Sequence, residues 1–196
     1  MRKLETKDYI LCALFTALIC VGAFIRVPIP IVPFTLQLLF TMLAGLLLGG
    51  RLGAVAVGVY IALGLAGVPV FTEGGGIGYI FKPTFGYIVG FAVAAYVTGV
   101  IANKVGNPDY RRLLLANFTG LIIVYAMGMV HLYFISNLYL GTPLGLWPLF
   151  LYGFLLAVPG DVVLCILAAI IAKRMIPAIR KEERLPYQKI GRNEDE

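Results

Sequence analysis

Residues 34–70 read FTLQLLFTMLAGLLLGGRLGAVAVGVYIALGLAGVPV and contain a single charged side chain, Arg51. Arg51 lies within Gly49-Gly50-Arg51-Leu52-Gly53, and glycines at this spacing are typical of a turn. The hydrocarbon core of a bilayer is about 30 Å thick and needs roughly 20 apolar residues in helical form. The stretch therefore predicts two membrane-spanning helices, Phe34–Gly50 and Leu52–Val70, joined by a short turn.

Further apolar segments lie on both sides of this pair. Before it, Tyr9–Ile25 predicts a first span, and Val27–Pro33 predicts an extended, proline-rich hairpin. After it, the predicted spans are Pro83–Ala102 and Leu113–Leu138. The last apolar region is too long for one span. Because proline is favoured in the first turn of a helix, we start the sixth span at Pro159. Leu146–Val158 then predicts a short helix at the membrane surface or folded back into the membrane.

The composition supports a membrane protein. Of 196 residues, 60% are hydrophobic and only 13% are charged, whereas soluble domains carry about 25% charged residues. These values exclude an ordinary soluble enzyme, a disordered chain and a nucleic-acid-binding domain. We predict an all-α, polytopic integral membrane protein with six transmembrane helices in residues 1–176, followed by a charged cytoplasmic tail in residues 177–196.

The basic residues predict the orientation of the chain in the membrane. Six spans place both termini on one side. Fourteen of the 16 Lys and Arg residues then fall on that side, and only Arg26 and Lys82 fall on the other. Cytoplasmic loops of membrane proteins carry such an excess of basic residues, so we predict that both termini are cytoplasmic.

The sequence offers little for enzymatic chemistry. It has no glycine followed by lysine, which excludes the phosphate-binding loop of ATPases. It has one histidine, His131, and one serine, Ser136, at a spacing that does not favour a catalytic pair. We therefore predict no catalytic residue, no metal and no cofactor. An intramembrane enzyme remains an alternative, supported only by an acidic residue within a span.

Three polar residues on different spans are predicted to lie at a similar depth near the outer face. Asp161 opens the sixth span, Lys82 precedes the fourth and Gln37 lies one turn into the second. A carboxylate inside a membrane segment costs at least about 2.5–3.5 kcal/mol, so such residues tend to be functional. Structural roles remain open: Asp161 as a helix cap or ion-pair partner of Lys82 or Arg26, Lys82 as an interfacial lysine, and Gln37 as an interhelical hydrogen-bonding group.

A glycine-rich loop and neighbouring aromatic residues complete the predicted site. The loop, residues 71–78, reads FTEGGGIG and could cover a pocket that opens to the outside. Apolar walls could come from four aromatic residues, Tyr79, Phe81, Phe85 and Tyr87. On the first span, Ala13 and Ala17 are small residues four positions apart, a spacing that lets another helix approach closely. Because the chain contains no ATPase motif, an active transporter of this kind needs a partner.

Four motifs resemble the BioY family, the biotin-capturing S components of energy-coupling factor (ECF) transporters. They are VPFTLQ at 32–37, GVPVF at 67–71, GGG at 74–76 with PTFGYIVGF at 83–91, and PGD at 159–161. The resemblance covers essentially the whole chain up to the tail. It implies the six-helix S-component fold in the plasma membrane of a prokaryote, capture of biotin from outside, and docking onto a transmembrane coupling subunit that carries two cytoplasmic ATPases.

The resemblance also assigns roles to residues. Asp161 is implied to meet the ureido ring of biotin, and Ala13 and Ala17 match the face that contacts the coupling subunit. The other predicted ligand-binding residues are Lys82, Gln37, Thr35, Gly75, Tyr79, Thr84 and Tyr87. Two positions depart from the family pattern: Leu164 stands where many members have lysine, and Phe85 interrupts a common P-T-G-G-Y sequence. The partner of the biotin carboxylate is therefore open, with Lys82 as a candidate. An S component for another small vitamin and a self-sufficient facilitator remain alternative functions.

Overall fold

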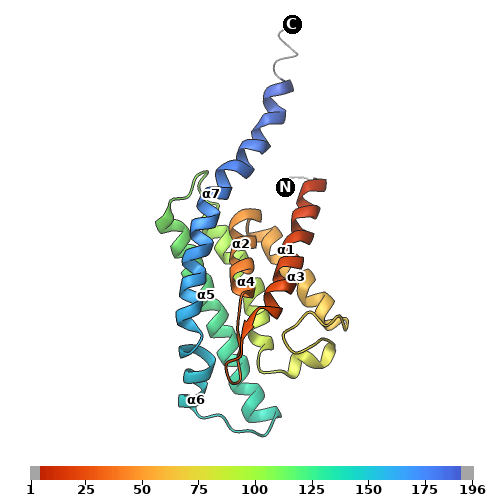
Figure 1. Ribbon diagram of the computed structural model, residues 1–196, viewed down its shortest axis with the longest axis vertical. Coiled ribbons are helices and arrows are strands. Elements are labelled where there is room, and N and C mark those ends of the chain that lie inside the picture. Colours follow the sequence, from red (N-terminus) through yellow and green to blue (C-terminus); the bar gives the residue numbers. More distant parts are fainter. Residues whose placement is uncertain (1–4, 191–196) are drawn as a thin grey trace.

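The computed structural model describes residues 5–190, with side chains described for residues 5–179. The chain is almost entirely helical (Figure 1). In chain order the elements are α1 (Thr6–Phe24), β1 (Arg26–Val27), β2 (Phe34–Thr35), α2 (Gln37–Leu48), α3 (Gly50–Leu65), the 3-10 helix η1 (Ile77–Phe81), α4 (Phe85–Ala102), α5 (Tyr110–Phe134), the π-helical turn η2 (Ile135–Tyr139), α6 (Leu146–Phe150), the π-helical turn η3 (Leu151–Leu155) and α7 (Val158–Ile190).

Six apolar helices form the bundle, as predicted, but they differ in length. Four helical stretches within the described residues are long and apolar enough to cross a membrane: Thr6–Phe24, Phe85–Ala102, Tyr110–Tyr139 and Leu146–Ile179. The helices α2 and α3 are shorter. At about 1.5 Å per residue, the 12 residues of α2 extend about 18 Å, which is less than the hydrocarbon thickness.

The predicted limits of the second and third spans were wrong. Phe34 and Thr35 form β2, which pairs antiparallel with β1, so the second helix begins only at Gln37. The predicted Gly49–Gly53 turn is reduced to one residue, because Gly49 takes up φ 84° and α3 begins at Gly50. The third helix ends at Leu65 rather than Val70 because Gly67, at φ 105°, turns the chain away.

The last helix extends further in both directions than a single predicted span. It begins at Val158, one residue before the predicted start, and its backbone continues helically to Ile190. It therefore passes position 176 without a break, and residues 191–196 of the predicted tail lie outside the described residues. The predicted short helix corresponds to α6 with η3, which continue the line of α7 at one end of the bundle (Figure 1).

Glycines allow α2, α3 and α4 to pack with their backbones in contact. A Cβ atom on Gly99 of α4 would lie 2.6 Å from the carbonyl oxygen of Gly45, and one on Gly53 would lie 2.8 Å from the Cα of Gly45. Both distances are far below a normal carbon contact, so only glycine fits. Such close approach between small residues is the usual basis of helix association in membranes.

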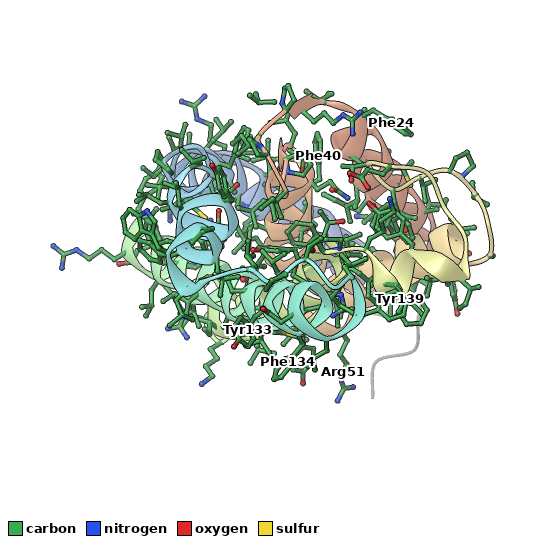
Figure 2. The ribbon with its side chains drawn as sticks, turned by 90° about the horizontal axis from the view of Figure 1, so that it is seen from below. Phe24, Phe40, Arg51, Tyr133, Phe134 and Tyr139 are labelled. Carbon is green, nitrogen blue, oxygen red and sulfur yellow. The ribbon has the colours of Figure 1, made fainter. Side chains whose placement is uncertain are left out.

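Large apolar side chains cover the outer surface of the bundle. Leu115 and Ile122 on α5 are 61% and 69% exposed, and similar residues occupy the outer faces of α1 and α7. Tyr133 and Phe134 project outward near one end (Figure 2). In water this surface would be unstable, whereas in lipid it is favoured, and aromatic side chains are typical of the membrane interface.

Both ends of the described chain lie at the same end of the bundle. The start of α1 lies at this end and the last turns of α7 extend beyond it, whereas the β1–β2 hairpin, the loop before α4 and α6 lie toward the opposite end (Figure 1). This arrangement is the one that an even number of crossings produces. It brings the proline-rich hairpin and the glycine-rich loop to the end where Asp161 begins its helix.

Candidate ligand-binding site

A cavity with a volume of about 50 Å³ lies between the hairpin, the first turns of α2, α4 and α7, and the middle of α5. We call it the inner cavity. Apolar side chains make most of its wall, and the other lining residues carry hydroxyl groups, one amide and one carboxyl group. The lining residues are Val32, Pro33, Phe34, Thr35, Gln37, Leu38, Thr72, Thr84, Tyr87, Ile88, Phe91, Val124, Tyr125, Ala157 and Asp161. Apolar walls with a few placed polar groups are typical of small-molecule sites.

Among residues 5–179, whose side chains are described, Asp161 is the only acidic residue that lines the inner cavity. One of its oxygens, Oδ2, accepts a hydrogen bond of 2.5 Å from the hydroxyl group of Tyr125. Within residues 5–179, the other oxygen, Oδ1, accepts no hydrogen bond, and no cation forms a salt bridge with the carboxylate. A carboxylate accepts through both oxygens, so Oδ1 remains able to receive a donor from a ligand.

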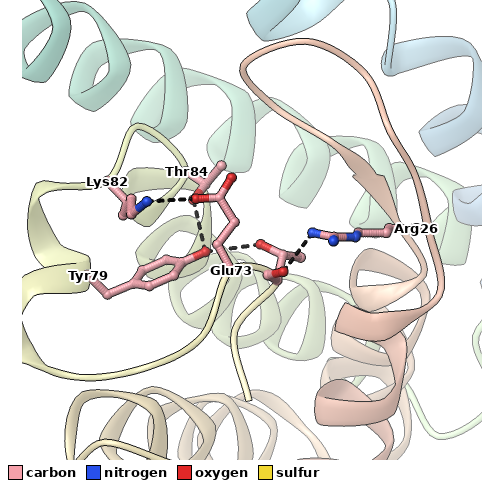
Figure 3. Close-up of polar contacts among 6 residues, drawn as sticks. Arg26, Glu73, Tyr79, Lys82 and Thr84 are labelled. Carbon is pink, nitrogen blue, oxygen red and sulfur yellow. Dashed lines mark hydrogen bonds and ion pairs between the residues drawn. The ribbon is translucent and has the colours of Figure 1, made fainter. Parts of the chain in front are cut away.

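The structure does not show the ion pairs considered for Asp161. The ammonium group of Lys82 lies 3.1 Å from Oε2 of Glu73 (Figure 3). Arg26 instead donates a hydrogen bond of 2.6 Å to the backbone carbonyl of Thr72. Asp161 does lie in the first turn of α7, where the helix dipole stabilises a negative charge. Its side-chain contact, however, is with Tyr125 on another helix.

The side chain of Gln37 is held by neighbours and forms part of the wall. Its amide group donates a hydrogen bond of 2.7 Å to the hydroxyl of Tyr60, and its carbonyl oxygen accepts one of 3.3 Å from Thr35. The predicted interhelical role is thus present in the structure, because Tyr60 belongs to α3. Gln37 also lines the inner cavity, so the two roles are compatible.

The glycine-rich loop is fixed to the site through hydroxyl groups. Tyr79 is buried, and its hydroxyl lies 3.0 Å from that of Thr72 and accepts a hydrogen bond of 3.2 Å from Thr84 (Figure 3). Thr72 and Thr84 line the inner cavity, but Tyr79 supports them from behind. Gly75 does not line the cavity; it packs against the end of α3, because a Cβ there would lie 2.9 Å from the backbone carbon of Val68.

Aromatic rings form the deep side of the inner cavity. The hydroxyl group of Tyr87 donates a hydrogen bond of 2.7 Å to the carbonyl of Gly153, so this residue faces the cavity mainly with its ring. The rings of Tyr87 and Tyr125 meet edge to face, with centroids 6.0 Å apart. Gly128 permits this arrangement, since a Cβ there would overlap the ring of Tyr87.

Five of the eight predicted ligand-binding residues come together in the inner cavity: Asp161, Gln37, Thr35, Thr84 and Tyr87. Tyr79 stands behind its wall, Gly75 packs against the end of α3, and Lys82 lines a separate, neighbouring cavity. Ala13 and Ala17 lie far from both cavities in sequence and are exposed on the same side of α1. Among the described residues, no cluster of three or more His, Cys, Asp or Glu side chains could hold a metal ion.

Sequence reasoning missed Tyr125 and Thr72. A tyrosine in the middle of an apolar span needs a hydrogen-bond partner for its hydroxyl group, and that requirement was a usable signal for Tyr125. No signal distinguished Thr72 from other loop residues, because its place in the wall depends on the packing of the loop. The hairpin residues Val32 and Phe34 were quoted in a motif, but their position in the wall was not predicted.

The fold and the cavity together define a helical bundle with an apolar outer surface suited to lipid and an internal, largely apolar cavity that carries a few hydrogen-bonding groups. The BioY family model matches residues 1–181. The chain belongs to the BioY family.

Individual relatives agree with this assignment. A probable biotin transporter BioY of Lysinibacillus sphaericus is 43% identical over 190 residues, which is 97% of either chain. The biotin transporter BioY of Thermotoga maritima is 37% identical over 170 residues, covering 86% of this chain and 95% of the relative. A crystal structure of the S-component for biotin from an ECF-type ABC transporter superimposes with a TM-score of 0.71 at 28% identity, covering 88% of this chain and 94% of that one.

Proposed function

We propose that this protein is the substrate-binding membrane subunit of an ECF-type transporter and captures biotin from outside the cell for ATP-driven uptake. One observation carries the proposal: in a chain of this family, a carboxylate in an apolar cavity has one oxygen that accepts no hydrogen bond from the part of the chain whose side chains are described. Such an oxygen, half-buried beside a tyrosine, is suited to a polar but uncharged ligand group.

The chemistry of the inner cavity complements biotin. The ureido ring has two N–H donors and one carbonyl acceptor. Oδ1 of Asp161 accepts from an N–H of the ligand. The second N–H of Gln37 and the hydroxyl of Thr72 can donate to the ligand carbonyl, because the hydroxyl protons of Thr35 and Thr84 are donated to Gln37 and Tyr79. Phe34, Phe91 and Val124 provide apolar surface for the sulfur-containing ring. Because the ligand's polar groups are paired in a dry site, analogues without them are rejected strongly.

We further propose that the partners are a transmembrane coupling subunit and two cytoplasmic ATPases, and that both termini face the cytoplasm. The excess of basic residues on the side of the termini supports this orientation. The exposed Ala13 and Ala17 support a docking face on α1, since small residues allow a partner helix to approach. The charged segment 177–196 is proposed to lie on the cytoplasmic side.

Titration calorimetry of the detergent-solubilised protein tests the ligand. We expect about one biotin per chain and no displacement of biotin by an excess of other vitamins, because only biotin presents a ureido group to Asp161. A folded sample that gives no signal with biotin would contradict the proposal. Displacement by another vitamin would favour an S component of different specificity, and uptake by cells lacking the ATPases would favour a facilitator.

Replacing Ala13 and Ala17 with leucine tests the docking face. We expect the double variant to bind biotin with wild-type affinity but to lose co-purification with the coupling subunit, because the larger side chains hold a partner helix away. Leu14 to alanine, on the same exposed side of α1, is the matched control and leaves assembly intact. If the double variant lost biotin binding but still assembled with the coupling subunit, the two alanines would have a role in ligand binding and not in docking.

A further inference from the structure

A second, larger cavity adjoins the inner one. This outer cavity has a volume of about 690 Å³ and lies between the loop before α4 and the segment that links α5 to α6. Its lining residues are Ile31, Glu73, Gly78, Phe81, Lys82, Pro83, Thr84, Ser136, Tyr139, Leu140, Thr142, Pro143 and Leu144.

At three points, adjacent residues of the chain line the two cavities. Val32, Thr72 and Thr84 line the inner cavity, while their neighbours Ile31, Glu73 and Pro83 line the outer one, and Thr84 borders both. The outer cavity is therefore the neighbouring space for the part of a ligand that does not fit in the inner cavity.

The two cavities differ in charge. The inner cavity has one acidic residue, Asp161, and no Lys, Arg or His among the residues that line it. The outer cavity has one cation, Lys82, which forms an ion pair of 3.1 Å with Glu73. The two side chains are 49% and 43% exposed, so the pair is open to exchange with another anion.

We propose that the outer cavity binds the carboxylate end of the ligand, and that Lys82 exchanges Glu73 for this carboxylate when the ligand enters. The proposal rests on the proposed function, since it assigns the second end of the biotin molecule. Glu73 then forms the ion pair with Lys82 while the site is empty, and it competes with the ligand carboxylate for the same ammonium group.

The exchange requires movement of the Glu73 side chain alone. The backbone around it is held, because Phe71 and Gly74 exchange two hydrogen bonds of 2.9 and 3.2 Å and the N–H of Gly76 donates to the carbonyl of Gly64 at 2.7 Å. The carbonyl of Thr72 is held by Arg26, and its hydroxyl contacts Tyr79 (Figure 3). Glu73 can thus leave Lys82 while Thr72 keeps its place in the wall.

Binding of two matched ligands by three proteins tests the exchange. The ligands are biotin and its primary amide, which keeps the rings and the chain but has no charge. We expect the wild-type protein to bind biotin about tenfold more tightly than the amide. Lys82→Met should remove this difference by lowering the affinity for biotin and leaving the affinity for the amide unchanged. Glu73→Gln removes the competitor, so biotin affinity should rise about threefold while the amide is unaffected.

Lys104→Met is the matched control, since it removes a lysine near the opposite end of α4 and should change neither affinity. The proposal is overturned if Lys82→Met weakens both ligands equally, which indicates a structural role, or weakens neither. It is also overturned if Glu73→Gln lowers the affinity for biotin. Wild-type protein that binds neither ligand would contradict the proposed function itself. Binding that depends on Asp161 but is unchanged by substitution of Lys82 or Glu73 would contradict only this inference.

Discussion

Replacing Asp161 with asparagine is expected to weaken biotin binding by up to about 100-fold, because hydrogen bonds to a charged acceptor contribute roughly 1.5–3 kcal/mol and the ligand N–H would meet a weaker or wrongly oriented group. The carboxylate is the acidic group of the inner cavity, and its Oδ1 accepts no hydrogen bond within residues 5–179. Calorimetry with biotin measures the loss.

Two further measurements separate a ligand-binding role from a structural one. The thermal stability of the ligand-free Asp161→Asn variant should equal or exceed that of wild type, because a half-buried charge without a cationic partner is removed. Tyr125→Phe should lower the affinity for biotin by only about tenfold. The hydroxyl of Tyr125 positions the carboxylate of Asp161, and the carboxylate itself remains in this variant.

Asp109→Asn provides the matched control for Asp161. It makes the same carboxylate-to-amide change at the start of α5, where the side chain caps the helix by accepting from the backbone N–H of Arg112 at 3.0 Å. We expect little change in stability, because asparagine caps a helix about as well as aspartate, and unchanged affinity for biotin. If Asp161→Asn bound biotin within about threefold of wild type, the proposed contact would be wrong.

Replacing Gly99 with alanine is expected to lower the melting temperature by about 10 °C, the shift that an overpacking cost near 3 kcal/mol produces in a chain of this size. The added Cβ would lie 2.6 Å from the carbonyl oxygen of Gly45 and equally close to the backbone carbon of Gly49. Because both are backbone atoms, relief requires α4 to move away from α2 and α3. Gly99→Leu should yield no folded protein.

Gly58→Ala is the control for the glycine contact. Gly58 also lies within a helix, but an added Cβ there would have no atom within 4 Å. The change should leave stability equal or slightly higher, since alanine favours helix by about 1 kcal/mol over glycine. Purified Gly99→Ala should still bind biotin normally, because the inner cavity lies near the opposite end of α4. An unchanged melting temperature for Gly99→Ala would contradict the packing described here.

The sequence predicted the class of fold because hydrophobicity is a local property. Apolar runs between charges identified six helices, prolines identified the hairpin, and Pro159 identified the start of the last helix to within one residue. Helix limits failed where a distant segment intervened. Phe34 and Thr35 left the second helix because β1 pairs with them, and Gly50 joined the third helix because Gly49 alone makes the turn.

Motifs also identified the family, and Asp161 was singled out as a candidate binding residue because an acid in an apolar span is costly wherever it lies. Only the tertiary structure decided what surrounds Asp161: a tyrosine from α5 rather than Lys82 or Arg26, with Lys82 instead beside Glu73 in a second cavity. The rotation of each helix and the path of each loop set those neighbours, and they follow from the packing of the whole bundle rather than from any single segment.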